Sequence, residues 1–176
     1  YDPEKAKQLL AEAGYPNGFQ TRIFSQPGLV DRDAMVAVQG FLSDVGIEAE
    51  LEFPDRGKYN NLRFKGWENG LLSQAMRMLA TTNITYTFYC HTAAGQFPNM
   101  KRPDGFVDKL DASLQTLFPE KEKMEELTRM LIDDATFIPM FYVSESRILQ
   151  PNVHDTGYFE WEAGTVFTPE RMWLSK

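Results

Sequence analysis

Apolar residues recur at helical spacing in several segments of the chain. In the first of them, residues 2–14, Asp2 can cap the free amide groups, and Pro3 suits the first helical position because it has no amide hydrogen. Gly14 can then end the helix in the left-handed conformation. The same periodicity predicts three more helices, over residues 31–45, 105–117 and 120–135.

Strand patterns lie between these helices. Residues 47–53 alternate apolar and acidic side chains, which is typical of a strand with one solvated face. Short strands are also predicted over residues 19–25 and 62–67. Residues 137–143 are a candidate buried strand, in which Pro139 favours an edge position or a bulge.

The pattern weakens over residues 68–100, where Gly, Ser, Thr, Asn and aromatic residues are mixed. A helix over residues 71–80 is compatible with the sequence, and we interpret the rest as a long functional loop region. The tail after Leu149 is predicted to be irregular as far as residues 168–171. This order of elements predicts an α/β lobe, in which helices pack on a mixed sheet.

Length and charge narrow the function classes. The chain has 176 residues, which suits one domain or one large lobe, and its net charge is −7. Its 18 Lys and Arg residues are scattered, which argues against a nucleic-acid partner. The longest apolar run, residues 137–143, is too short to span a bilayer. The chain begins with Tyr1, and we expect it to be part of a longer protein.

Motifs for catalysis or metal binding are missing from the sequence. It contains no Gly-x-Ser-x-Gly, Gly-x-x-x-x-Gly-Lys-Ser/Thr or Gly-x-Gly-x-x-Gly motif. His91 and His154 lack metal-ligand spacing, so we expect no metal and no cofactor. Cys90 and His91 are adjacent, but neighbours in sequence generally point apart, and we interpret Cys90 as a small buried residue. We therefore expect that the protein is not an enzyme.

Several segments, in the right order, resemble family-5 bacterial extracellular solute-binding proteins. Residues 1–19, YDPEKAKQLLAEAGYPNGF, are similar to a long stretch of that family, and residues 38–51 resemble its next helix–strand unit. The remaining similarities are the pair Gly66-Trp67, residues 106–111, residues 124–143 with Pro139 and Tyr142 at matching places, and the closing residues 168–174. The resemblance covers nearly the whole chain and is weakest over residues 71–103.

The resemblance implies a type II periplasmic-binding-protein-like fold, of which residues 1–176 would be the C-terminal lobe. A first lobe would precede Tyr1, and the tail, residues 150–176, would pack back toward it. The two lobes would close over a peptide or other small solute and deliver it to ABC permease subunits. The protein would work in the periplasm or on the extracellular face of the membrane, and as a lipoprotein in a Gram-positive cell. The alternative is the solute-sensing domain of a bacterial transcription regulator.

The resemblance also implies where a solute would bind. The family's cleft is lined by residues just after the Gly-Trp pair, so Trp67 is the first ligand-contact candidate, as an apolar wall with a donor N–H. Packing within the lobe is the alternative role for it. Peptide-binding members often have an Asp three positions later, where this chain has Gly70, which puts a standard peptide in doubt. Glu68 and Asn69 are the polar groups nearby, and the lower-ranked candidates are Tyr86, Tyr89 and His91.

Overall fold

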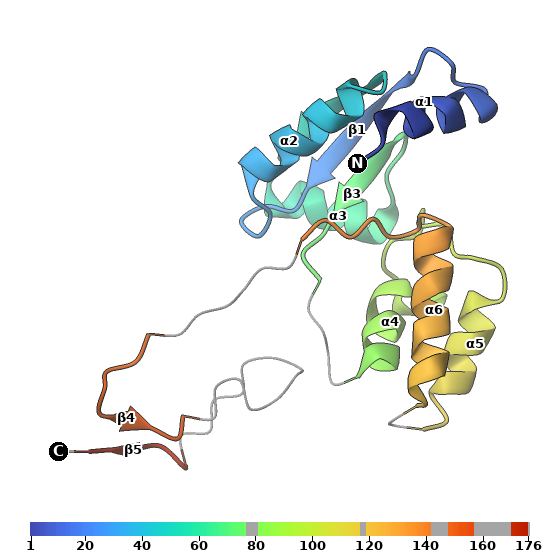
Figure 1. The fold of residues 1–176 in the computed structure, drawn as a ribbon. Helices are drawn as coiled ribbons and strands as arrows, with labels where there is room; N and C mark the ends of the chain where they lie inside the picture. The colour runs from blue at the N-terminus through green and yellow to red at the C-terminus, as the bar shows by residue number, and fades with distance from the viewer. Residues whose placement is uncertain (77–80, 117–118, 142–147, 157–169, 176) are drawn as a thin grey trace. The chain divides into compact units, whose positions relative to one another are not determined.

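A computed structural model describes residues 1–76, 81–116, 119–141, 148–156 and 170–175 (Figure 1). The chain divides into two compact units. Unit 1 comprises Tyr1–Met76 and Gln96–Asn99, and unit 2 comprises Arg77–Gly95 and Met100–Lys176. Across these described ranges, no helix has the length and apolar character needed to cross a membrane.

Unit 1 is built from alternating helices and strands around a parallel sheet. Its elements are α1 (Pro3–Glu12), β1 (Phe19–Ser25), α2 (Arg32–Ser43), β2 (Ile47–Glu52), α3 (Arg56–Lys65) and β3 (Gly70–Ser73). The strand order is β2-β1-β3, with Phe19 opposite Ile47 and Arg22 opposite Gly70. The sequence signals for α1, β1, α2 and β2 are therefore confirmed.

Each helix of unit 1 begins at an aspartate cap. Asp2 accepts a hydrogen bond from the amide of Lys5, and Asp55 accepts one from the amide of Lys58. Asp31 accepts from two amides at the start of α2. Such caps satisfy amide groups that have no partner inside the helix, and each contributes about 1 kcal/mol.

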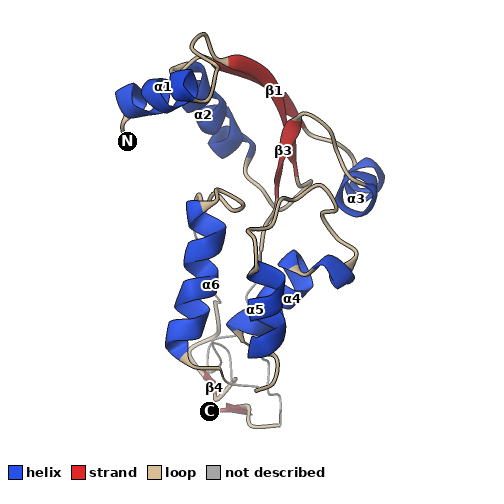
Figure 2. Ribbon diagram, turned by 90° about the vertical axis from the view of Figure 1, so that its right-hand side faces the viewer, coloured by secondary structure: helices blue, strands red, loops and turns tan. Residues whose placement is uncertain are grey.

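The two faces of the sheet differ in character. On one face α2 packs over a core of Ile23, Met35 and Ala49. Alternate residues of β1 and β2 point to the opposite face, which carries Gln20, Arg22, Glu48, Glu50 and Glu52 together with the buried Phe24. α1 and α2 lie on one side of the strands and α3 on the other (Figure 2).

Unit 2 is mainly helical. It contains α4 (Thr82–Cys90), a 3-10 turn (Thr92–Ala94), α5 (Phe106–Ser113) and α6 (Lys121–Asp133), and a short antiparallel pair of strands, β4 (Val153–His154) and β5 (Trp173–Leu174). The three α-helices lie side by side in both ribbon views. Their shared core includes Phe106, Leu110, Leu127 and Leu131. α5 and α6 confirm the helices predicted over residues 105–117 and 120–135, although both are shorter.

Three predictions between residues 62 and 100 are wrong. Residues 62–65 are not a strand, because α3 runs on to Lys65 and ends at Gly66, whose φ is +101°. The predicted loop region contains α4, whose buried face carries Asn83, Thr85, Tyr86, Tyr89 and Cys90. That face has helical spacing, but polar and aromatic residues occupy it, so the pattern of aliphatic residues did not reveal it. A helix over residues 71–80 is also wrong where it can be checked, because β3 continues to Ser73, and residues 77–80 lie outside the described residues.

The expected strand over residues 137–143 is wrong over residues 137–141, which form no strand in the structure. Phe137 donates its amide hydrogen to the carbonyl of Leu131 and so closes the end of α6. Pairing with a neighbouring strand is what would make the following residues a strand, and the described sheets supply none. Residues 142–143, including Tyr142, lie outside the described residues, as do Thr168 and Pro169 of the closing motif.

Candidate functional site

The strongest candidate site is the turn that joins α3 to β3. It begins at Gly66, where α3 ends, and it returns to the sheet at Gly70. Trp67, Glu68 and Asn69 lie between these glycines, so one turn brings together the first four site residues that the sequence predicted. We call residues 67–70 the Trp67 turn.

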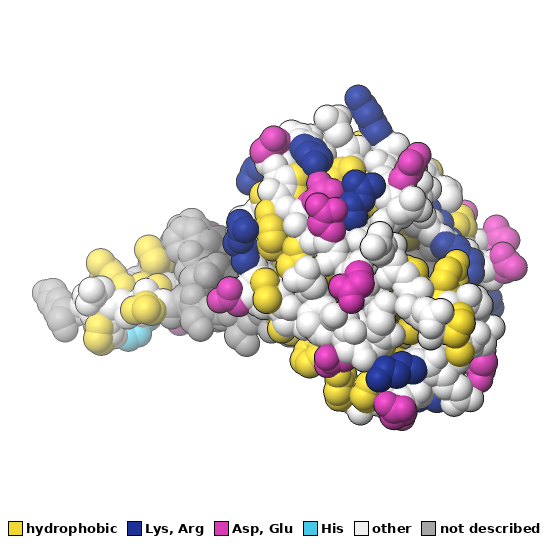
Figure 3. Space-filling model, turned by 90° about the horizontal axis from the view of Figure 1, so that it is seen from above, with side chains coloured by type: hydrophobic (Ala, Val, Ile, Leu, Met, Phe, Trp, Pro, Cys, Tyr) yellow, Lys and Arg dark blue, Asp and Glu magenta, His cyan; other side chains and the backbone are white. Residues whose placement is uncertain are grey.

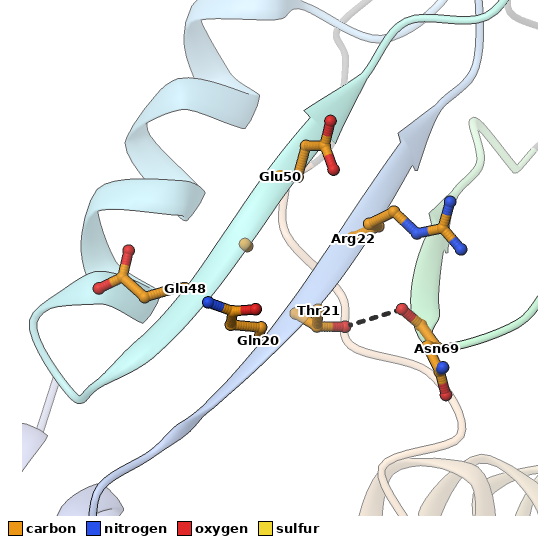
Figure 4. A pocket seen from close by; sticks show the side chains of 7 residues that line it. Gln20, Thr21, Arg22, Glu48, Glu50 and Asn69 are labelled. Atoms are coloured by element: carbon orange, nitrogen blue, oxygen red, sulfur yellow. Dashed lines mark hydrogen bonds between the residues drawn. The ribbon is translucent and has the colours of Figure 1, made fainter.

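The backbone carbonyls of the Trp67 turn are held by side chains of unit 1. The indole Nε1 of Trp67 donates to the carbonyl of Gly70 at 2.8 Å. Arg22 Nη2 donates to the carbonyl of Glu68, and Thr21 Oγ1 donates to that of Asn69, both at 3.3 Å. Figure 4 shows the Thr21–Asn69 contact as a dashed line. The side chains of Glu68 and Asn69 remain exposed, and are therefore available to another molecule.

Trp67 is anchored as well as partly accessible. Its ring meets the ring of Phe97 edge-on, with centroids 6.4 Å apart, and Phe97 is buried. Because the indole N–H is bound to Gly70, Trp67 offers a solute the apolar surface of its ring rather than a free donor. These contacts support a packing role for Trp67 within unit 1. Because its ring is only half-buried, the same side chain can also form an apolar wall for a solute.

Gly70 is fixed by close packing against β1. A Cβ at this position would lie 2.7 Å from the carbonyl oxygen of Arg22 and 3.0 Å from the ring of Phe24. The nearer contact is with backbone, which cannot move without distorting the sheet. An Asp at position 70 would therefore not fit this arrangement.

A polar depression lies next to the Trp67 turn on the solvated face of the sheet. It is lined by Gln20, Thr21, Arg22, Glu48, Ala49, Glu50 and Asn69 (Figure 4). Arg22 pairs with Glu52 at 3.2 Å, and Lys58 pairs with the other oxygen of Glu52 at 2.7 Å. The hydrogen bond from Lys58, and then that from Arg22, hold the pKa of the Glu52 carboxyl below its ordinary value.

The lower-ranked candidates belong to unit 2. Tyr86 and Tyr89 are buried, and the hydroxyl of Tyr86 bonds to Thr128 at 2.7 Å. His91 Nδ1 accepts the amide hydrogen of Ala93, and its Nε2 lies 3.1 Å from Asp111 Oδ1. All three have structural contacts in the helical unit, and neither unit brings them together with the Trp67 turn.

Cys90 and His91 do not form a catalytic pair. Cys90 is fully buried, and burial raises the pKa of its thiol to about 12. A nucleophilic cysteine needs the opposite, a lowered thiol pKa and a neighbouring base. The Nδ1 atom of His91 already accepts a backbone hydrogen bond. Over the described part of the chain, no group of three His, Cys, Asp or Glu side chains could hold a metal ion.

Charged side chains of both signs are interspersed on the face of the molecule that Figure 3 shows. The basic residues there do not gather into a patch.

The sequence did not reveal the residues that hold the Trp67 turn. Arg22 and Thr21 lie on β1, and Asn99, which accepts the amide hydrogen of Trp67 at 2.9 Å, follows it by 32 positions. Their roles depend on contacts between distant parts of the chain, for which one sequence carries no local pattern. Trp67 was found through the resemblance alone.

Comparison with known proteins places these features in a family. Residues 1–96 match the model of the bacterial extracellular solute-binding proteins, family 5 middle region. Among curated proteins, the chain is 82% identical over 27 residues to heme-binding protein A of Haemophilus influenzae, which is 15% of this chain and 5% of that protein. It is 42% identical over 59 residues to the glutathione-binding protein GsiB of Escherichia coli, which is 33% of this chain and 12% of that protein.

Two solved structures share the fold over 98% of this chain. One is the ABC transporter-associated periplasmic binding protein DppA of Helicobacter pylori, in complex with the peptide STSA, with a TM-score of 0.65 and 22% identity. The other is HbpA2 of Haemophilus parasuis, with a TM-score of 0.65 and 20% identity. This likeness confirms the predicted α/β fold class. The chain covers 34% and 35% of those two chains, about a third of each.

Proposed function

The chain belongs to the bacterial extracellular solute-binding proteins of family 5, and on this basis we propose that it supplies the solute-contacting lobe of an ABC importer's binding subunit. The observation that carries the proposal is the Trp67 turn. Its backbone carbonyls are bound within unit 1, while Glu68 and Asn69 remain exposed beside the ring of Trp67. Such a turn is preorganised, so it can contact a solute without a change in its backbone.

The chemistry of the turn favours a solute with a positively charged amino group beside an apolar or planar part. The Glu68 carboxylate can pair with the amine, Asn69 can donate and accept hydrogen bonds, and the Trp67 ring can cover apolar surface. Glu68 would replace the Asp that has no room at position 70. Short peptides and glutathione both carry a free amino group. The solved structure of DppA is a complex with the peptide STSA, and GsiB is named as a glutathione-binding protein.

The mechanism that we propose is capture by closure. A solute that touches both lobes stabilises the closed form by its differential contacts, and no bond is made or broken. The closed protein would then deliver the solute to permease subunits, in the periplasm or on the extracellular face of the membrane, where a lipid anchor would hold the Gram-positive form. The relatives named above are binding proteins by name, which supports import over the sensory alternative and over an enzyme.

Calorimetric titration of the full two-lobed protein tests the proposal. We expect the peptide Ser-Thr-Ser-Ala or reduced glutathione to bind, and Glu68→Gln to weaken binding about tenfold or more, because a hydrogen bond to a charged group contributes about 1.5–3 kcal/mol. An N-acetylated form of the same ligand should bind the wild type and Glu68→Gln equally, since its amine charge is gone.

Glu122→Gln is the matched control, because Glu122 is an exposed glutamate of unit 2. It should leave both affinities unchanged. Equal loss of affinity on N-acetylation in wild type and Glu68→Gln would show that Glu68 does not contact the amine. Absence of binding for peptides, glutathione and heme alike would overturn the proposal of solute capture.

We also propose that the chain is the C-terminal lobe, and that its tail, residues 150–176, packs against a first lobe. Two apolar surfaces support this. After α6, residues 137–141 expose Ile138 (65%) and Phe141 (53%). In the tail, Trp173 stacks on His154 in the β4–β5 pair, and Leu174 is 64% exposed. A two-stranded pair is marginally stable alone, so it needs a covering surface.

Hydrogen exchange measured by mass spectrometry on the full two-lobed protein tests this arrangement. We expect the amides of residues 138, 140 and 141 to exchange about 100-fold or more slowly than free amides, because pairing and burial by the first lobe would protect them. The turn at residues 27–29, which is exposed or half-buried in unit 1, provides the unprotected reference. Equal exchange in the two segments would contradict the arrangement.

A further inference from the structure

A short segment from later in the chain packs against the end of α3. This segment, Gln96–Asn99, belongs to unit 1, although the residues on both sides of it belong to unit 2. The amide of Phe97 donates to the carbonyl of Arg63 at 2.7 Å, and the guanidinium group of Arg63 donates to the side chain of Gln96. The side chains of Gln96 and Phe97 are both buried. The segment is therefore fixed on α3 by specific contacts.

Asn99 ends this segment directly over the start of the Trp67 turn. Its Oδ1 accepts the amide hydrogen of Trp67 at 2.9 Å. A Cβ at Gly66 would lie 2.0 Å from the same oxygen. Gly66 also has a φ of +101°, which a residue with a side chain rarely adopts. The missing side chain at position 66 thus lets Asn99 approach the backbone where the chain leaves α3.

The amide of Trp67 is the first backbone group of the turn, so fixing it sets the direction in which the turn starts. Three further bonds hold the rest: Arg22 to Glu68, Thr21 to Asn69, and Trp67 Nε1 to Gly70. Of these four bonds, the one that Asn99 accepts joins the turn to a residue outside residues 1–76. The same segment also orients the indole, because the ring of Trp67 rests edge-on against the ring of Phe97.

We propose that Asn99 is a positioning residue for solute binding: it fixes the backbone of Trp67 and thereby the side chains of Glu68 and Asn69, without touching the solute itself. The inference rests on the proposed function of the Trp67 turn. A turn that is held in its binding geometry loses less conformational freedom when a ligand binds, so removing Asn99 weakens affinity through loss of preorganisation.

The variants Asn99→Ala and Asn99→Asp in the full two-lobed protein separate positioning from general stability. Alanine removes the acceptor, whereas aspartate keeps an oxygen of nearly the same size and place. Asn60→Ala is the control, because Asn60 is an exposed asparagine of α3. The readout is hydrogen exchange of the Trp67 amide and indole N–H by nitrogen-15 NMR without solute, with the indole signal assigned through Trp67→Phe.

We expect Asn99→Ala to speed exchange of both Trp67 groups about tenfold, as expected for a loosened local hydrogen bond. Asn99→Asp should restore slow exchange, and the melting temperature of Asn99→Ala should stay close to that of Asn60→Ala. Binding of Ser-Thr-Ser-Ala should weaken about fivefold in Asn99→Ala and recover in Asn99→Asp. Unchanged exchange in Asn99→Ala, or no recovery with Asp, would overturn the positioning role.

The exchange measurement also separates this inference from the proposed function. If Ser-Thr-Ser-Ala fails to bind the wild type, the peptide assignment fails, and the exchange data still decide whether Asn99 holds the turn. If the peptide binds equally well to the wild type and Asn99→Ala while exchange is faster, solute capture stands and the positioning role is refuted.

Discussion

Replacing Gly18 with alanine should destabilise unit 1 by about 3 kcal/mol or more, because the new Cβ has no space. It would lie 1.7 Å from the carbonyl oxygen of Gly46 and within 3 Å of two more atoms of that residue. All of these atoms are backbone, so a side-chain rotation cannot relieve the contact. Gly18 also has a φ of +70°, which adds strain for any residue with a Cβ.

Two other glycines of unit 1 separate the steric effect from the conformational one. Gly14 has a φ of +91° but nothing within 4 Å of its Cβ position, so Gly14→Ala should cost only about 1–2 kcal/mol. Gly40 lies inside α2, and its Cβ position also has nothing within 4 Å. Gly40→Ala should stabilise the protein by about 0.5–1 kcal/mol, because alanine favours a helix more than glycine does.

Urea unfolding followed by circular dichroism gives the free energy of unfolding for all three variants. The expected order of stability is Gly40→Ala, wild type, Gly14→Ala and then Gly18→Ala. A Gly18→Ala variant as stable as Gly14→Ala would show that the two turns, after α1 and after α2, do not meet as closely as the structure places them.

The first half of unit 1 could be predicted because its signals are local. Asp2 caps its helix as the sequence suggested, and the acidic alternation of residues 47–53 does mark a strand with one solvated face. Each of these features is set by residues within one turn of helix or one strand. The boundaries therefore agree with the structure to within two residues.

The errors arose in two helices whose buried residues are polar or aromatic rather than aliphatic. Residues 62–65 continue α3 because the helix begins at the Asp55 cap and ends only at Gly66. α4 is stabilised through buried polar and aromatic side chains, which a search for aliphatic periodicity does not detect. In both cases helical spacing was present, but the residue types did not suggest a buried face.

In the candidate site too, some residues could be predicted from the sequence and others could not. Trp67 and Gly70 could be located from the resemblance, but the reason for Gly70 became visible only through its approach to Arg22 and Phe24 on β1. Arg22, Thr21 and Asn99 could not be predicted, because each acts on the turn from a distant position in the sequence. The sequence thus located candidate contact residues, and the structure adds the residues that hold them.

Replacing Asn83 with alanine should destabilise unit 2 about as much as Gly18→Ala destabilises unit 1. Its side chain is 1% exposed and links the start of α4 to the end of α5. Nδ2 donates to the carbonyls of Ser113 at 3.1 Å and Thr116 at 3.4 Å, while Oδ1 accepts from the amide of Ile84 and the hydroxyl of Thr81. Asn83→Ala removes all of these bonds inside the core, and we expect a loss of about 2–4 kcal/mol.

Asn83→Asp tests which half of the amide matters. The carboxylate keeps the acceptor but faces two carbonyl oxygens, so burial and repulsion should raise the pKa of this new carboxyl above its ordinary value of about 3.9. A group with a raised folded-state pKa contributes stability that is present below the unfolded pKa and is lost as pH rises through the folded pKa. The variant should therefore be nearer to wild type at about pH 4 than at about pH 7.

Urea unfolding at both pH values gives the free energy of unfolding of Asn83→Ala, Asn83→Asp and the exposed control Asn60→Asp, and so tests the expected pH dependence. The control should show no such pH dependence, because Asn60 lies on the exposed side of α3. If Asn83→Asp matches wild type at pH 7, its carboxylate has found solvent and the buried link does not exist. If it is destabilised equally at both pH values, shape rather than charge governs the site, and the two donated bonds are not the main contribution of Asn83.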